Sequence, residues 1–320
     1  MITAWPALPA DAWADTLETL HRYTQIVGKI RMGYGPWLNH SWGVTLYVTP
    51  RGLSTGIVPH GEAAFEARLD LLDSALVVEA NSGRRETVGL QTTVAEVYAG
   101  VLAAFERLGL PVSIDPLPSE IADAIPFDED TEHGPYDPAH AQLMLRAWID
   151  SERVMSAFRA QFVGKSSPVH LYWGGMDLAV YRFSGRAAPE HPGGGAPNLP
   201  LDVERDSYSH EVTAVGLWLG SRQLPYPGFF AYTYPAPDRL GQAEIAPEAA
   251  SWNEDGGLFN LPYEAVRTAD DPDAALLAFC ESTHAAGAAL GGWDRAAVEL
   301  DPPQGAGWWR HRSRRVSRGG

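Results

Sequence analysis

The sequence predicts an α+β protein with two similar lobes, each an antiparallel β-sheet flanked by helices. Runs of alternating and β-branched residues, separated by Gly, Asn and Pro turns, are typical of antiparallel strands. Helical periodicity brackets these runs on both sides. The order helix, strands, helix, short strand then occurs a second time within the 320 residues. Such a repeat indicates an internal duplication.

The first lobe is expected over residues 1–115. Its first helix is predicted from Asp11 to about Ile30, with Gly28 as its stop signal. Thr92 or Thr93 is expected to cap a second helix that runs to about Leu108. Strands are predicted between and after these helices, at residues 42–49, 53–58, 65–71, 75–80, 86–90 and 111–114.

Residues 116–138 are predicted to form an acidic, Pro-rich linker. The stretch 115–140 holds five prolines, eight acidic residues and no Lys or Arg. His133 and the acids around it (Asp128, Asp130 and Asp137) have the composition of a metal site, but their irregular spacing matches no metal-binding motif. A solvated linker or a helix-capping turn is the preferred interpretation.

The second lobe is expected over residues 139–301, followed by a basic tail over 302–320 that is predicted to be disordered. Helices are predicted at 139–162 and 272–290, and a long hairpin lies after the first of them. Strands are then predicted at 209–219, 229–234, 258–261 and 297–300.

The duplication also predicts where a site lies. The only two lysines, Lys29 and Lys165, each follow Val-Gly, and each precedes a His and a Trp-Gly pair. Ungapped alignment of those pairs places Arg51 opposite Arg182, and Leu46 opposite Asp177. Because the first copy lacks this carboxylate, one functional site is expected, in the second lobe.

Composition excludes several classes of function. With 24 basic and 40 acidic residues the net charge is −16, which argues against nucleic acid and anionic membranes as main partners. The single Cys280 excludes an intrachain disulfide framework and any multi-cysteine zinc site. Neither a signal sequence nor a membrane-spanning apolar run is recognisable, so a cytoplasmic location is expected.

The stretch 159–186 is the most informative segment. It carries four basic residues against the single acid Asp177, in an otherwise acidic chain. Gly174-Gly175 separates two strand-like runs and predicts a tight hairpin, because Gly tolerates positive φ. In that register Tyr172 faces Asp177 and His170 faces Ala179. His170, Tyr172 and Asp177 then share one face, and the other face is apolar.

These residues are the candidate catalytic group. His170 and Asp177 are diagonal neighbours in the predicted hairpin, about 7–8 Å apart at the backbone, and a nearby carboxylate raises the pKa of a histidine toward neutrality. Lys165, Arg182 and Arg186 are candidate binders of an anionic group, with Trp173 and Ser184 beside them. Two alternatives remain open: a solvated sheet face, and structural pairing of the cations with Glu211 or Asp177.

The strand after the hairpin adds further candidates. Tyr208 and His210 share a face, whereas Glu211 points to the opposite one. His170, His210 and Asp177 have the composition of a two-histidine, one-carboxylate metal triad, but their spacing does not demand one, and no metal is assigned. The sequence has no nucleophile elbow, phosphate loop or dinucleotide fingerprint, and it identifies no cofactor. The Pro/Gly-rich loop 187–206 is a candidate lid.

Four segments resemble a bacterial family catalogued only as a domain of unknown function. They read VGKIRMGYGPWLNHSWGVTLYVTPRGL, FVGKSSPVHLYWGGMDLAVYRFSGRAAP, YSHEV and LPYEAVR. The resemblance extends to about residue 300 and implies no activity. The chain departs from the family pattern at Leu219, where Pro is usual, and near Ser74, where a His is frequent.

Two functions are therefore compatible with the sequence. One is an enzyme that acts on a small anionic metabolite beneath the 187–206 loop. The other is a non-catalytic binding or structural protein whose polar cluster joins the two lobes.

Overall fold

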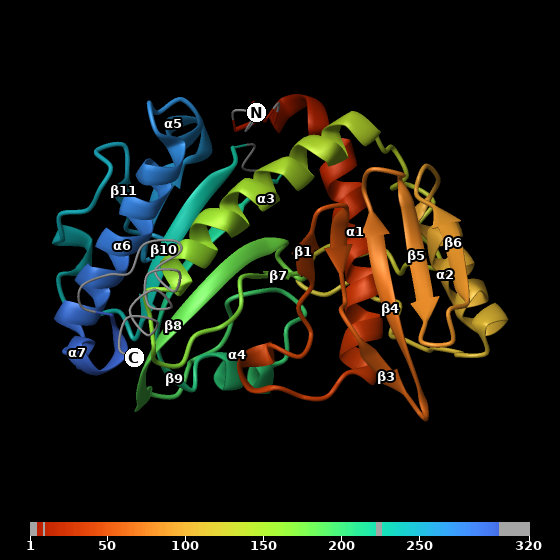
Figure 1. Cartoon of the computed structure of the whole chain (residues 1–320), viewed down its shortest axis with the longest axis horizontal. Coiled ribbons are helices and arrows are strands. Elements are labelled where there is room, and N and C mark those ends of the chain that lie inside the picture. The colour runs from red at the N-terminus through yellow and green to blue at the C-terminus, as the bar shows by residue number, and fades with distance from the viewer. Residues whose placement is uncertain (1–4, 9, 222–225, 301–320) are drawn as a thin grey trace, which may run out of the picture.

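The computed structural model describes residues 5–8, 10–221 and 226–300. Over these residues the fold is α+β, with seven α-helices and two antiparallel sheets of six strands each. The expected fold class is therefore confirmed. The two sheets lie side by side, the first orange and the second green to teal in Figure 1. The predicted basic tail lies outside the described residues.

The first sheet has the order β1-β2-β4-β5-β6, with β3 paired to β4. Helix α1 packs against β4, and α2 packs against β5 and β6. Thr93 and Glu96 form the capping box that begins α2, and Gly109 ends it with a φ of 75°. The elements are α1 (Ala10–Tyr34), β1 (Tyr47–Thr49), β2 (Gly52–Ser54), β3 (Val58–His60), β4 (Ala63–Asp70), β5 (Ala75–Ala80), β6 (Arg85–Gly89) and α2 (Val94–Leu108).

The second sheet has the order β11-β12-β10-β9-β8-β7. Helices α3 and α6 pack on each other and against its central strands. In each of them an Asp caps the N-terminus and a Pro follows at once, which suits the first turn of a helix. The elements are α3 (Pro138–Arg159), β7 (His170–Tyr172), β8 (Asp177–Ala187), α4 (Leu201–Ser207), β9 (His210–Trp218), β10 (Gly228–Tyr234), β11 (Ser251–Asn253), β12 (Leu258–Pro262), α5 (Tyr263–Arg267), α6 (Pro272–Leu290) and α7 (Arg295–Val298).

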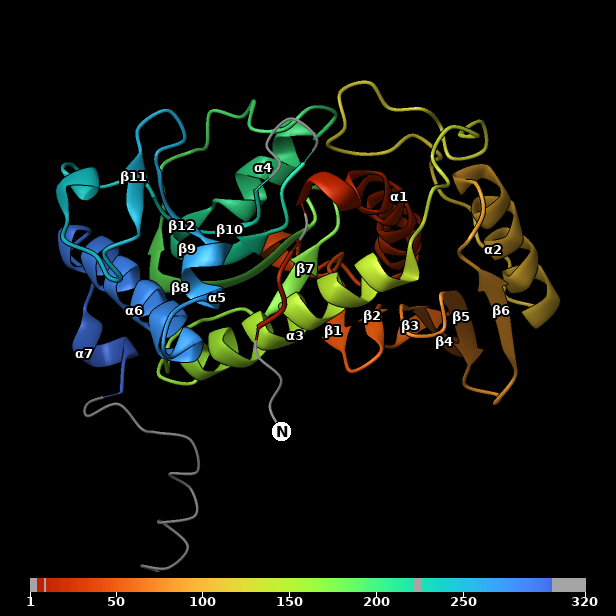
Figure 2. The ribbon, with the colours of Figure 1, turned by 90° about the horizontal axis from the view of Figure 1, so that it is seen from above.

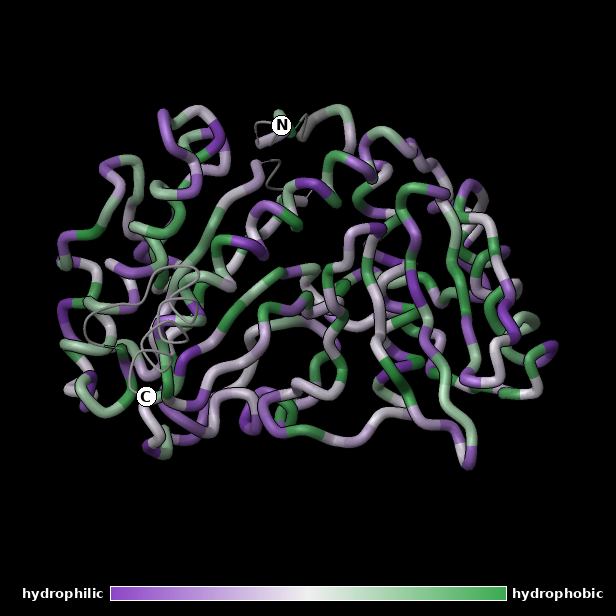
Figure 3. The backbone as a smooth tube through the Cα atoms, viewed as in Figure 1, coloured by the Kyte–Doolittle hydropathy of each residue, from purple (hydrophilic) through white to green (hydrophobic). Residues whose placement is uncertain are grey.

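The two lobes are joined by backbone as well as by side chains. Leu46 and Leu171 exchange two backbone hydrogen bonds, of 2.9 and 2.7 Å. The main hydrophobic core runs through both lobes. Figure 2, seen from above, shows α3 lying along both halves of the molecule. In Figure 3 hydrophobic residues follow the strands of both sheets, whereas α3 alternates between hydrophobic and hydrophilic residues.

Several predicted elements differ in the structure. Helix α1 does not stop at Gly28 but continues to Tyr34. The lack of a side chain at Gly28 leaves room for the ring of Trp173. The strand predicted over 42–49 is reduced to β1, after a 3₁₀ turn at Asn39–Ser41. Residues 111–114 form no strand. The strand predicted over 297–300 is replaced by α7, where Asp294 caps the amide of Ala297.

The acidic segment between the lobes is ordered by hydrogen bonds to the first lobe. Asp130 is fully buried, and its carboxylate accepts hydrogen bonds from the backbone and ring of His133. The carbonyl oxygens of Asp130 and His133 accept the first amides of α2. These contacts match the helix-capping interpretation. None of the described helices is long and apolar enough to cross a bilayer.

Candidate functional site

The hairpin of β7 and β8 has the predicted register, with Tyr172 opposite Asp177 and His170 opposite Ala179. Its two glycines have a different role from the one expected. Met176 takes the positive φ, 62°, whereas neither Gly174 nor Gly175 does. A side chain at Gly174 would overlap the carboxylate of Glu120, and a Cβ at Gly175 would lie 2.9 Å from Asp177 Oδ2. The glycines thus make room for two carboxylates.

These carboxylates face a cavity of about 500 Å³ between the lobes and the 187–206 loop. Its wall includes residues of the first lobe, the inter-lobe segment and the second lobe, so the cavity is not confined to the second lobe as expected for the site. Aromatic side chains form much of the wall, namely Trp37, Trp42, Tyr172, Trp173, Tyr181, Phe183, Tyr208 and Tyr232. Residues from Gly195 to Glu204, within the loop predicted as a candidate lid, cover one side.

Four acidic residues line the cavity, and two of them have partners. Asp115 pairs with Lys29 at 3.3 Å. Glu204 accepts hydrogen bonds from the amides of Gly194 and Gly195 at 2.9 and 2.8 Å, and so holds the covering loop. Asp177 and Glu120 have no hydrogen bond or ion pair to any residue that the structure describes. Both point into the cavity without a counter-charge.

The environment raises the pKa of both groups. Burial, and then the charge of Glu120, raise the pKa of Asp177 to about 7. Burial, and then the charge of Glu204, raise the pKa of Glu120. Asp177 remains partly accessible because it faces the cavity, although protein surrounds it on its other sides. A carboxyl group with a pKa near neutrality exchanges protons readily at physiological pH.

A cluster of tyrosines surrounds Asp177. The hydroxyl of Tyr172 donates to the carbonyl of His40 at 3.1 Å, and the hydroxyls of Tyr208 and Tyr232 lie 3.2 Å apart. The rings of Tyr172 and Tyr181 meet edge to face at 5.7 Å. Burial raises the pKa values of Tyr172, Tyr181 and Tyr232, so their hydroxyls remain protonated hydrogen-bond donors.

His40 forms another part of the cavity wall. Its Nδ1 lies 3.2 Å from the carbonyl oxygens of Asp206 and Ser207 and therefore carries the proton, while Nε2 lies 2.5 Å from Lys165 Nζ. Burial and the Lys165 charge lower the pKa of His40. His40 has a φ of 60° and is 2% exposed. It is thus a neutral, fixed imidazole that accepts from the lysine.

His170 does not form the expected pair with Asp177. Its ring is fully buried, contacts the rings of Tyr172 and Trp42, and has Nδ1 3.1 Å from Thr45 Oγ1. Burial, and then the charge of Arg31, lower the pKa of His170 to about 3. A histidine in this state is neutral at physiological pH, so its position suits packing between the lobes rather than proton transfer.

The predicted anion binders are also dispersed. Arg182 is 3% exposed, lies 3.4 Å above the ring of Phe158 and donates to that residue's carbonyl, on the far side of the sheet from the cavity. Arg186 pairs with Glu211 at 2.6 Å, and Ser184 donates to the same carboxylate. Arg186 therefore has the structural ion pair with Glu211 that was the alternative to anion binding. Of the three predicted anion binders, only Lys165 lies beside the cavity wall, where it contacts His40.

The structure thus brings together part of the predicted set. Tyr172, Trp173, Asp177 and Tyr208 line the cavity. His210 lies next to it, with its ring edge-on to His40 at 5.5 Å. Sequence reasoning missed Glu120, His40, Tyr181 and Tyr232 as site residues. Tyr181 had a usable signal, since it shares the strand face of Asp177, whereas Glu120 lies in a segment with no periodicity.

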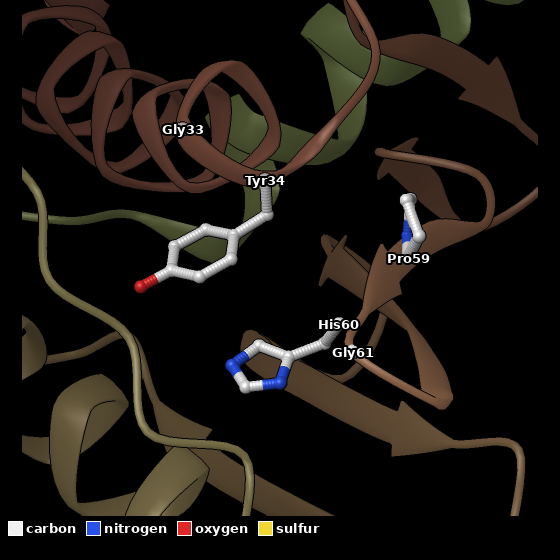
Figure 4. Close-up of a pocket in the computed structure, with 5 residues that line it drawn as sticks. All are labelled: Gly33, Tyr34, Pro59, His60 and Gly61. Carbon is white, nitrogen blue, oxygen red and sulfur yellow. The ribbon is translucent and has the colours of Figure 1, made fainter.

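No group of three or more His, Cys, Asp or Glu side chains among the described residues is placed to hold a metal ion. A second, open depression of about 360 Å³ lies at the end of α1, lined by Gly33, Tyr34, Pro59, His60 and Gly61 (Figure 4). There the Tyr34 and His60 rings stack at 5.1 Å and bind the backbone of Ser113 and Pro111. These bonds anchor the start of the inter-lobe segment.

Comparison with known proteins gives a family and no activity. Searches of curated proteins and of solved structures returned no significant match. The model of a family of unknown function, DUF5996, matches residues 5–300, which include every residue of the cavity. The chain therefore belongs to this family of unknown function, DUF5996.

Proposed function

We propose that the cavity binds a small molecule and that Asp177 transfers a proton to or from it, so that the protein is an enzyme. The observation that carries this proposal is a carboxyl group without a partner, at an aromatic cavity, with a pKa near 7. Perturbed carboxyl groups in clefts are typical of general acids and bases. Glu120 contributes by its charge, which helps to hold the pKa of Asp177 near neutrality.

The sequence-based version of this hypothesis had an anionic metabolite, His170 as the partner of Asp177, and three cations as binders. Support for it now rests on Lys165 and His40 at the cavity wall. Arg182 and Arg186 are engaged elsewhere, and His170 is buried against Thr45. Asp177 and the tyrosines around it therefore take the central role in the proposed chemistry.

A ligand screen tests the binding step. Metabolite panels are added to the wild-type protein and to Ala196→Trp, in which an indole fills the cavity from the covering loop. Pro197→Trp is the matched control, because it places the same ring on the neighbouring exposed residue, outside the cavity lining. We expect ligands that raise the melting temperature of the wild type and of the control but not of Ala196→Trp. Equal responses of all three proteins would contradict a site in this cavity.

The catalytic step needs a separate test. Each ligand found in this way is incubated with wild-type protein and with Asp177→Asn, and the products are followed by NMR. We expect turnover with the wild type and a loss of at least about 100-fold in rate with the variant, the usual contribution of a general acid or base. If ligands bind to the wild type but never react, the protein is a binding protein and the proposed catalytic function is refuted.

A second candidate is a non-catalytic protein whose polar cluster joins the lobes. The observation that favours it is a set of side-chain bonds across the lobe boundary. His21 Nε2 lies 2.7 Å from the carbonyl of Gly174, and Thr45 contacts His170. This function predicts that removal of the Asp177 charge lowers stability, whereas a proton-transfer group held without a partner predicts the opposite.

A further inference from the structure

The charges of the cavity wall do not balance. Lys29 is neutralised by Asp115 at 3.3 Å, and the imidazole of His40 is neutral. The Lys165 ammonium contacts His40 and lies over the rings of Trp42 and Phe183, and not beside Asp177 or Glu120. Glu204 is satisfied by two backbone amides. Glu120 and Asp177 then remain as two carboxylates in one cavity, with no cation facing them among the described residues. An isolated buried carboxylate is costly, and two that repel each other are more so.

The backbone holds this unfavourable arrangement in place. Glu120 has a φ of 59°, in the left-handed region that non-glycine residues rarely adopt. Of the seven non-glycine residues with positive φ in the described parts of the chain, four line the cavity: His40, Ser41, Glu120 and Asn198. Backbone strain of this kind, about 1–3 kcal/mol at each residue, concentrates at ligand sites. The two hairpin glycines leave the space that the carboxylates occupy.

The aromatic lining points to the charge of the ligand. Tyr172, Tyr181 and Tyr232 line the same cavity as the carboxylates, and no Lys or Arg of the described chain lies over their rings, whereas Lys165 lies over those of Trp42 and Phe183. Ring faces are electron-rich and attract cations, particularly organic ones. A bare metal ion is a poor occupant, because the described residues offer no third His, Cys, Asp or Glu ligand at this place.

We infer that the cavity takes a small organic cation, with a protonated amine or guanidinium group that bonds to Glu120 and Asp177 among the tyrosine rings. The cation supplies the missing charge and donates charge-assisted hydrogen bonds to both carboxylates. A neutral ligand can donate hydrogen bonds but supplies no charge, and an anion adds to the repulsion. This inference rests on the proposed ligand site. It gives the ligand a positive charge, whereas the sequence alone led us to expect an anion.

The test uses three panels of small metabolites of similar size: cations (polyamines, choline, agmatine, amino sugars), neutral polyols and sugars, and anions (carboxylates and inorganic phosphate). Melting temperature and calorimetric affinity are measured for each compound. We expect saturable binding from the cationic panel, at least tenfold tighter than any neutral analogue of the same skeleton. Asp177→Asn and Glu120→Gln should each weaken it tenfold or more.

Glu190→Gln is the matched control, because it removes the same charge from an exposed residue of the covering loop that pairs with Arg205 outside the cavity. It should leave the affinity unchanged. Binding of anions or neutral compounds without cations would overturn this inference while leaving the cavity as a ligand site. A protein that binds no compound of any panel, and is indifferent to Ala196→Trp, would refute the ligand site and the inference together.

Discussion

The indole of Trp173 lies directly against the α carbon of Gly28, so a turn of the second lobe fits into a helix of the first without a side chain between them. The same indole donates to the carbonyl of Val44 at 2.7 Å. A methyl group at Gly28 would overlap the ring.

Gly28→Ala is therefore expected to destabilise the protein. Overpacking of a buried contact costs about 1–3 kcal/mol, more than the helical preference of Ala recovers. Gly33→Ala is the matched control in the same helix, because nothing lies within 4 Å of its added methyl group. That change should stabilise the protein by about 0.5–1 kcal/mol. Denaturant unfolding measures both, and equal effects at the two positions would refute the interlocking contact.

Removal of the Asp177 charge should stabilise the protein at alkaline pH. The pKa of Asp177 is raised from 3.8 to about 7 by burial and by Glu120, so folding favours its protonated form. As pH rises from 3.8 through 7, the wild type loses stability that Asp177→Asn retains. We expect the variant to be more stable at pH 8 by about 4 kcal/mol, and no more stable than the wild type at pH 4. Lower stability of the variant at pH 8 would favour the lobe-joining function.

Acid should destabilise the fold through its buried histidines, among them His170 and His284. Burial lowers the pKa of His170 to about 3 and that of His284 to about 4, from 6.5. Below pH 6.5 the unfolded chain binds protons that the folded chain does not, so stability falls as pH decreases toward these values. Each histidine contributes about 1.4 kcal/mol per pH unit. Between pH 6 and 4, His170→Gln should reduce the slope of unfolding free energy against pH by the contribution of one proton. An unchanged slope would contradict the burial of His170 as a neutral ring.

The two arginines first expected to bind an anion should differ in their effects. Arg182 is buried over Phe158 and bonded to its carbonyl, so Arg182→Ala is expected to cost about 2–4 kcal/mol of unfolding free energy. Arg186 is half-exposed and pairs with Glu211, so Arg186→Ala should cost less than about 1 kcal/mol. Urea titration measures both. If Arg186→Ala abolished ligand binding in a stable protein, an anion site at this arginine would have to be reconsidered.

Much of the second lobe could be predicted from local signals. Asp137 with Pro138 and Asp271 with Pro272 mark where helices begin, and the Gly-Gly pair marks the position of the hairpin, whose register was predicted. These features depend on neighbours within a few residues. The face that carries Tyr172 and Asp177 followed from the same register, and it does line the cavity.

The rest of the site depends on contacts between distant segments. His40 is fixed by the backbone of Asp206 and Ser207, more than 160 residues away, and no local pattern indicates this. Arg182 was expected to bind an anion, but its partners are the aromatic rings of Phe158 and Phe162. Gly28 resembles a helix stop in sequence, and only the position of Trp173 shows its other role.

The paired backbone hydrogen bonds of Leu46 and Leu171 close a loop of 125 residues across the lobe boundary, and both residues are completely buried. Neither amide can meet solvent unless the lobes separate. In native-state hydrogen exchange the two amides should exchange at one common rate, set by the opening of that boundary. Their protection would report directly whether the halves of the molecule open independently or unfold together.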